Sequence, residues 1–200
     1  MLTKARLNEI HNRLSKGLGY YLILLGLTTG LRFEELVGLT FDDFDFTKNT
    51  IRVNKTWGYN NRMQEGFGPT KNEQSNRIVE VDVITMNLFK ELFKNIKANL
   101  HGLVFYSPES KYKVISNTNA NKLLKNTLLD LQIEPITMHG LRHTHASTML
   151  YKKVSIYYVS ERLGHKDIET THKHYSHVTK ELREEDARAT TMIFEEMFIA

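Results

Sequence analysis

The stretch LGHKDIETTHKHYSHV, residues 163–178, and the stretch HGLRH, residues 139–143, are the most informative parts of this sequence. The first stretch places Tyr175 ten residues after His165, and the second places Arg142 three residues after a histidine. A phenol near arginines and imidazoles is suited to attack a phosphate. Guanidinium groups can hold the non-bridging oxygens while an imidazole accepts or donates a proton. The two stretches therefore predict a phosphoryl-transfer site.

The composition indicates one folded domain with a polyanionic partner. The chain has 200 residues, of which 40% are hydrophobic and 25% charged, so it can bury a core of its own. The formal net charge is +4, and the tail from Lys180 onward holds six acidic residues against three basic ones. The excess positive charge therefore lies before residue 180, and we expect the tail to face away from the polyanion.

Several kinds of site and location are disfavoured. The chain has no cysteine, so neither a disulfide nor a thiolate metal site can form. The longest apolar run, residues 20–27, is too short to cross a bilayer, and the N-terminus lacks the order of a signal peptide. We expect a soluble, cytoplasmic protein with no membrane partner.

Hydrophobic spacing predicts a mostly helical chain with one small sheet. Helical patterns cover residues 5–14, 19–29, 31–39, 83–100, 117–131, 140–152 and 155–163. Alternating runs at residues 50–53 and 77–81, with Gly, Asn and Pro between them, predict a hairpin or a three-stranded meander. No repeat, low-complexity tract or Pro-rich linker divides the chain. The expected fold class is α+β, mostly α: a helical bundle with a small antiparallel three-stranded sheet.

A further motif lies near the N-terminus, where residues 28–36 read TTGLRFEEL. This Gly-x-Arg, with an acidic residue three positions later, completes a pattern with the two stretches above. Together they resemble the tyrosine recombinases, the family of phage and transposon integrases, over nearly the whole chain. The resemblance implies that Arg32 is the first catalytic arginine. Glu35 would share a helical face with Arg32, and we expect it to brace that arginine or a neighbouring basic group rather than meet substrate.

The resemblance also implies roles for the residues of the two opening stretches. Tyr175 would be the nucleophile, and Arg142 would clamp the phosphate near a helix N-terminus that favours anions. His139 would assist the deprotonation of Tyr175, and His165 would donate a hydrogen bond to a non-bridging oxygen.

A catalytic lysine is implied by residues 69–77, PTKNEQSNR. This segment resembles the Thr-Lys segment of the β2–β3 turn in the family, where the lysine is the general acid for the leaving 5′-oxygen. Lys71 is the candidate and Lys55 is its rival. Nearby arginines repel the positive charge of such an ammonium group, which lowers its pKa and favours proton donation.

The implied function is site-specific DNA recombination or integration, with strands cut and rejoined through a 3′-phosphotyrosyl intermediate. One phosphoester replaces another, so no cofactor is expected. The implied partners are double-stranded attachment or crossover sites and further copies of the chain, forming a tetramer on DNA. Two alternatives remain: DNA relaxation like that of a type IB topoisomerase, and a non-catalytic DNA-binding regulator.

The histidines suggest a metal site as another interpretation. Seven of the nine lie between His139 and His177, and His139 and His143 have the i, i+4 spacing of metal ligands. However, Gly140 stands where a zinc protease helix would carry glutamate. We therefore expect no metal.

The remaining expectations concern DNA contacts and domain boundaries. Candidates for contacts with the DNA backbone are the basic residues Lys48, Lys55, Arg62, Lys111, Lys113, Lys122 and Lys125. Residues 1–178 would form the catalytic domain, and residues 179–200 a C-terminal tail helix or segment. The tail would either pack on its own domain or be exchanged between protomers. Integrases also carry an N-terminal core-binding domain, which we expect to be absent from this chain.

Overall fold

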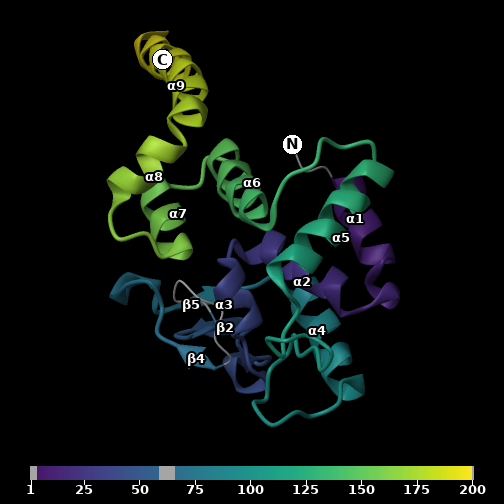
Figure 1. Ribbon diagram of the computed structural model, residues 1–200. Helices are drawn as coiled ribbons and strands as arrows, with labels where there is room; N and C mark the ends of the chain where they lie inside the picture. The colour runs from purple at the N-terminus through teal and green to yellow at the C-terminus, as the bar shows by residue number, and fades with distance from the viewer. Residues whose placement is uncertain (1–3, 59–65, 200) are drawn as a thin grey trace.

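A computed structural model describes residues 4–58 and 66–199 (Figure 1). Helices dominate it, as the hydrophobic spacing predicts. They are α1 Lys4–Asn12, α2 Leu18–Thr29, α3 Phe33–Val37, α4 Val83–Asn95, α5 Asn117–Asp130, α6 Met138–Tyr151, α7 Ile156–Leu163, α8 Ile168–His174 and α9 Ser176–Ile199.

Helix α2 is the centre of the main core. It is apolar on nearly all sides, and it packs against α1, α3, α4, α5 and α6, which leaves residues such as Leu22 and Leu25 without solvent contact. The helix ends at Gly30, which adopts a left-handed conformation with φ 68°. Glycine adopts that conformation without the steric penalty of a side chain. The chain then turns into α3, which lies beside α2.

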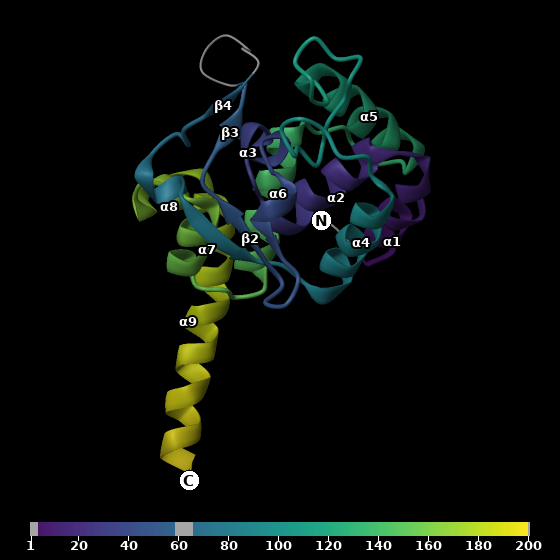
Figure 2. The same ribbon diagram turned by 90° about the horizontal axis from the view of Figure 1, so that it is seen from below.

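The expected three-stranded antiparallel sheet is present. Its strands are β1 Phe44–Asp45, β2 Thr50–Val53 and β5 Arg77–Glu80, in the order β1-β2-β5. Ile51 and Val79 are opposite one another in the register and both are buried. A second, two-stranded sheet pairs β3 Thr56–Trp57 with β4 Phe67–Gly68, and it was not predicted. It lies beside α3, at the end of the molecule opposite the C-terminus of α9 in Figure 2.

A second, smaller core lies between α6, α7 and α8. Its buried members are Ala146, Leu150, Val159, Leu163 and Tyr175. These residues lie in the stretch 163–178 or on α6 and α7, which connect it to the stretch 139–143. The small core therefore fixes the positions of the motif side chains.

Two predicted helices are shorter in the structure. The helix expected over residues 31–39 covers only Phe33–Val37, because Arg32 is extended, with φ −67° and ψ 154°, and acts as its N-cap. The helix expected over residues 83–100 ends at Asn95. Leu100, which continues its four-residue apolar repeat, is 94% exposed.

The tail is helical, and α9 extends away from the body of the molecule (Figures 1 and 2). It begins at Ser176, directly after Tyr175, and contacts α6 and α8. Several large apolar side chains along it are exposed, including Met197 and Phe198. No helix within residues 4–58 and 66–199 is long and apolar enough to span a membrane.

Candidate active site

Arg142 is held in the interior by the first turns of α6. The hydroxyl of Thr137 caps this helix by accepting from the amide of Gly140 at 3.1 Å. One turn later, Arg142 is 3% exposed and donates to the carbonyls of Gly30 at 2.8 Å and Leu163 at 2.7 Å. Burial, followed by the nearby charge of Arg32, lowers the pKa of Arg142 to about 9, so the guanidinium remains charged at neutral pH.

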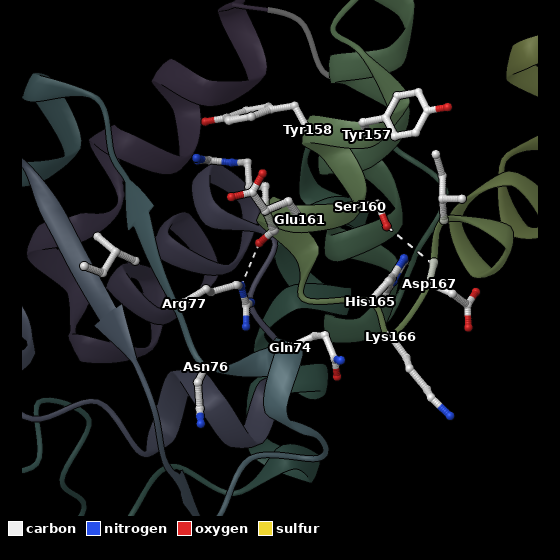
Figure 3. A pocket seen from close by; sticks show the side chains of 13 residues that line it. Gln74, Asn76, Arg77, Tyr157, Tyr158, Ser160, Glu161, His165, Lys166 and Asp167 are labelled. Atoms are coloured by element: carbon white, nitrogen blue, oxygen red, sulfur yellow. Dashed lines mark hydrogen bonds between the residues drawn. The ribbon is translucent and has the colours of Figure 1, made fainter.

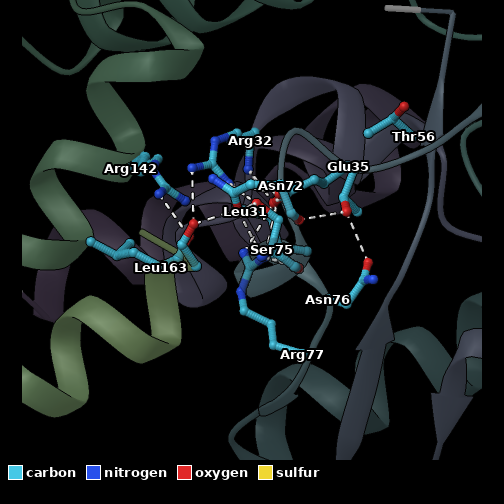
Figure 4. A network of polar contacts seen from close by, with 12 residues as sticks. Leu31, Arg32, Glu35, Thr56, Asn72, Ser75, Asn76, Arg77, Arg142 and Leu163 are labelled. Atoms are coloured by element: carbon cyan, nitrogen blue, oxygen red, sulfur yellow. Dashed lines mark hydrogen bonds and ion pairs between the residues drawn. The ribbon is translucent and has the colours of Figure 1, made fainter. Parts of the chain in front are cut away.

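Arg32 reaches the same turn from the start of α3. Its Nη2 donates to the carbonyl of Gly164 at 3.1 Å, and its Nη1 donates to Oε1 of Glu35 at 2.9 Å. The two arginines are thus anchored on consecutive carbonyls, those of Leu163 and Gly164. Figure 4 shows both side chains reaching this turn.

Glu35 is the buried anion of the site and is 1% exposed. Besides Arg32, it accepts from Arg77 at 3.0 Å between Nη2 and Oε2 and at 3.3 Å between Nη1 and Oε1. Burial alone would raise the pKa of Glu35, but the charges of Arg77 and Arg32 and their hydrogen bonds outweigh it, so the pKa lies below its ordinary value. Glu35 is therefore ionised and braces two arginines at once.

Arg77 is a member of this network to which the sequence motifs assign no role. It extends from β5, and its Nε donates to the carbonyl of Arg162 at 2.7 Å. Figure 3 shows Arg77 and His165 on opposite sides of a pocket between β5 and α7. Arg77 is the last residue of the segment 69–77 that contains Lys71. Its position in that segment does not indicate that it binds a buried carboxylate.

His165 follows the left-handed Gly164 that ends α7. Its Nδ1 lies 2.6 Å from the hydroxyl of Thr171, which fixes the orientation of the ring. Burial, followed by the charges of Arg142 and Arg32, lowers the pKa of His165 to about 3. The imidazole is therefore neutral at pH 7, and it lies beside the arginine pair.

Tyr175 ends α8 and is 2% exposed. Its hydroxyl lies 2.9 Å from Nδ1 of His143, a residue to which the motifs gave no catalytic role. His139, the predicted neighbour of the nucleophile, contacts the ring of His143 instead, with 4.7 Å between ring centroids. Burial raises the pKa of Tyr175, and the charge of Arg142 partly opposes that shift. The signal that could have identified His143 is its position one helical turn after His139.

Lys71 lies between β4 and β5 and is exposed. It lines a pocket together with Arg32 and His139, so three of the predicted residues share one opening. Its rival, Lys55, forms an ion pair with the buried carboxylate of Asp43. The structure therefore places Lys71 in the same pocket as Arg32 and gives Lys55 a different partner.

Two of the candidate DNA contacts lie beside this pocket. Asn117 and Asn121 on α5 line it, and Lys125 continues their row at four-residue spacing. Lys122 is next to Asn121, and both lysines are exposed.

The other candidates have protein partners nearby or fall outside the described residues. Lys48 is 3.9 Å from a carboxylate oxygen of Asp45, and Lys113 donates to the carbonyl of Pro108 at 3.3 Å. Lys111 lies over the ring of Tyr112, 5.9 Å from its centroid. Arg62 lies outside the described residues.

Several of the histidines are engaged in hydrogen bonds or ring contacts. His145, for example, uses Nδ1 on the carbonyl of Leu27 at 2.8 Å and accepts from Arg162 at Nε2 at 3.1 Å. Within residues 4–58 and 66–199, no group of three or more His, Cys, Asp or Glu side chains is arranged to hold a metal ion.

Comparison with known proteins identifies the family. The model of the phage integrase family matches residues 2–181, and the chain belongs to this family. It is 30% identical over 169 residues to the integrase of a Staphylococcus phage, covering 78% of this chain and 47% of that protein. It is 29% identical over 158 residues to the tyrosine recombinase XerD of Halalkalibacterium halodurans, covering 76% of this chain and 46% of that protein.

The fold is also that of solved members of the family. The Tn1549 transposon integrase, solved with circular intermediate DNA, superposes with a TM-score of 0.73 at 22% identity. The match covers 94% of this chain and 66% of that one. The chain spans about half the length of the curated relatives that it matches.

Proposed function

We propose that this chain carries the catalytic residues of a tyrosine-type site-specific recombinase, an enzyme that breaks and rejoins DNA for recombination or integration. The observation that carries the proposal is the anchoring of Arg32 and Arg142 on the adjacent carbonyls of Gly164 and Leu163, next to His165. A pair of guanidinium groups held by the protein is preorganised for the charge that develops on a phosphate in the transition state.

The proposed roles of the side chains are those that the sequence motifs imply. Arg32 and Arg142 hold the non-bridging oxygens, and His165 donates a hydrogen bond to one of them. The Oη atom of Tyr175 forms a bond to phosphorus as the bond between phosphorus and the 5′-oxygen breaks. Lys71 gives the leaving 5′-oxygen its proton. The product is a 3′-phosphotyrosyl bond and a free 5′-hydroxyl.

Rejoining is the reverse of this step. The 5′-hydroxyl of a second duplex attacks the phosphotyrosyl bond, and Tyr175 leaves with its proton restored. One phosphoester replaces another of similar energy, so the exchange proceeds without an external energy source. His139 shares a pocket with Lys71 and Arg32. Burial, followed by the charges of Arg142 and Arg32, lowers the pKa of His139, so it takes part as a neutral imidazole.

The proposed partners are double-stranded attachment or crossover sites and other copies of the chain, four on DNA. Residues 1–178 would form the catalytic domain, and the tail at residues 179–200 would pass to a neighbouring protomer. The projecting position of α9 and the exposure of Phe198, at 90%, support that exchange. An apolar surface of this kind commonly marks a contact with another protein.

The proposal is tested with negatively supercoiled plasmid in EDTA, quenched with SDS. We expect plasmid linked covalently to the protein, and no such adduct from Tyr175→Phe, which keeps the ring and removes only the nucleophile. An adduct with relaxation but without exchange between two duplexes would indicate a topoisomerase. Plasmid binding without any adduct would indicate a regulator.

A further inference from the structure

We propose that His143 accepts the phenolic proton of Tyr175 when the tyrosine attacks phosphorus. This inference rests on the function proposed above and concerns one step of it. The motif pattern assigns this proton to His139, whereas the contact made by the hydroxyl points to the residue one turn later on α6.

The geometry places donor and acceptor in direct contact. The hydroxyl of Tyr175 and Nδ1 of His143 are 2.9 Å apart, an ordinary distance for a hydrogen bond. The ring of Tyr175 is packed in the small core with Leu150 and Leu163, so the hydroxyl cannot move far without disturbing that packing. A proton acceptor must be within hydrogen-bond reach, and His143 meets that requirement.

The surroundings set the direction of the proton transfer. The charged or titratable groups near His143 are His139 and Arg142 on α6 and His174 on α8. Burial, then these neighbours, lower the pKa of His143, so its ring is neutral at pH 7. Burial raises the pKa of Tyr175, so the phenol keeps its proton until the attack. Tyr175 is thus the donor, and Nδ1 of His143, with its hydrogen on Nε2, is the acceptor.

Every proton is accounted for in both cleavage and rejoining. As the bond between Oη and phosphorus forms, the proton passes from Oη to Nδ1, and the bond to the 5′-oxygen breaks with a proton supplied by Lys71. His143 is then an imidazolium. When a 5′-hydroxyl attacks the phosphotyrosyl bond, Lys71 takes its proton and His143 returns its own to the departing phenolate. The protein ends in its starting state.

Two substitutions separate proton transfer from simple positioning. In His143→Asn, Oδ1 is bonded to Cγ as Nδ1 is in histidine, so the hydrogen bond from Tyr175 can remain while the proton has no acceptor. His143→Ala removes both. His143 and Tyr175 line a common pocket, which gives added imidazole a route to the vacated position. His172→Asn, at an exposed position on α8, is the matched control.

The rate of plasmid adduct formation in EDTA is the first readout. General bases contribute roughly 100-fold to 10,000-fold, so we expect both His143 variants to be at least about 100-fold slower than the wild type. His172→Asn should match the wild type. Imidazole should restore His143→Ala. A wild-type rate for His143→Asn, or a folded His143→Ala that imidazole leaves inactive, would overturn the proposal.

A second readout does not depend on DNA cleavage. In ¹⁵N-histidine NMR spectra of the whole chain, we expect Nδ1 of His143 to be unprotonated at pH 7 and its shift to change in Tyr175→Phe. A protonated Nδ1 would overturn the assignment even in an active enzyme. If wild-type protein formed no adduct, the proposed function would fail, and the NMR spectra would still decide whether His143 is the acceptor of this hydrogen bond.

Discussion

Nη2 of Arg77 lies 3.0 Å from Oε2 of Glu35, while the other oxygen of the same carboxylate holds Arg32. A residue of the sheet is thereby connected to an arginine of the proposed phosphate site through one buried anion. The position of Arg32 depends on β5 as well as on its own helix. Changes in this network are expected to alter both folding and catalysis.

Glu35→Gln is expected to lower the free energy of unfolding by about 3–5 kcal/mol at pH 7, because it leaves two arginines without their buried counter-charge. Urea denaturation measures this. The pKa of Glu35 is lowered in the folded protein, so its contribution is complete above the ordinary value of 4.5 and is lost as pH falls through the folded value. The difference between wild type and variant should therefore shrink in acid.

The control for this measurement is Glu91→Gln. Glu91 pairs with Lys94 at 2.6 Å, but the two side chains are 64% and 60% exposed. We expect a change within about 0.5 kcal/mol. Equal losses from the two variants would contradict the role given to Glu35.

Gly164→Ala is expected to damage the turn on which the arginines are anchored. Gly164 has φ +65°, and an added Cβ would lie 2.9 Å from Nη1 of Arg77 and 3.0 Å from the Cα of Ser75. Strain and crowding should cost about 1–3 kcal/mol and slow adduct formation. Gly17→Ala also has positive φ but would meet nothing within 4 Å, so it should destabilise without specifically affecting the adduct. Normal adduct formation by Gly164→Ala would argue against this anchor.

Lys71→Met and Lys55→Met are expected to change different properties: the first the rate of cleavage, the second the stability of the fold. Lys71 is exposed in the site pocket, so its loss should slow adduct formation about 100-fold or more and leave thermal unfolding nearly unchanged. Lys55 neutralises the buried Asp43, so its loss should lower stability by about 1–3 kcal/mol. Assays of both variants below their unfolding temperatures compare the chemistry directly. If Lys55→Met alone stopped cleavage, Lys55 would be the general acid.

Lys125→Gln is expected to weaken DNA binding in a salt-dependent manner. Each phosphate contact contributes about 0.9 to the slope of log K against log salt, so the slope should fall by about that amount. Fluorescence anisotropy with a duplex across a range of salt concentrations provides the slope. Lys94→Gln removes an equal charge from a lysine already paired with Glu91 and serves as the control. An unchanged slope for Lys125→Gln would remove this residue from the proposed interface.

Much of the fold could be predicted because local patterns dominate it. The apolar continuity of residues 19–29 predicted a buried helix, and α2 is the centre of the core. The alternation at residues 50–53 and 77–81 predicted the paired strands β2 and β5. The pattern failed at residues 83–100, where the apolar repeat continued past the end of the helix. There Asn99 donates to and accepts from the backbone of Leu103, which forms a turn in place of further helix.

Parts of the candidate site were predictable for a different reason. Arg142 lies within a short motif whose spacing fixes its place on a helix, so its position followed from local sequence. The contacts of Arg77 with Glu35 and of His143 with Tyr175 join residues 42 and 32 positions apart. They depend on how β5 and α8 pack against the rest of the chain. The periodicity of the sequence carries no information about such packing, so Arg77 and His143 were not predicted as site residues.

The site carries its charge on groups that do not titrate near neutral pH. Arg142 has a pKa of about 9, while His145 and His165 have pKa values of about 4 and 3. Between those limits none of the three side chains changes its ionisation. The attraction that Arg142 exerts on a phosphate should therefore change little near neutral pH, in contrast to histidine-based sensors. Burial thus keeps Arg142 charged and His145 and His165 neutral over this range, so these three side chains do not respond to small changes in the acidity of the solvent.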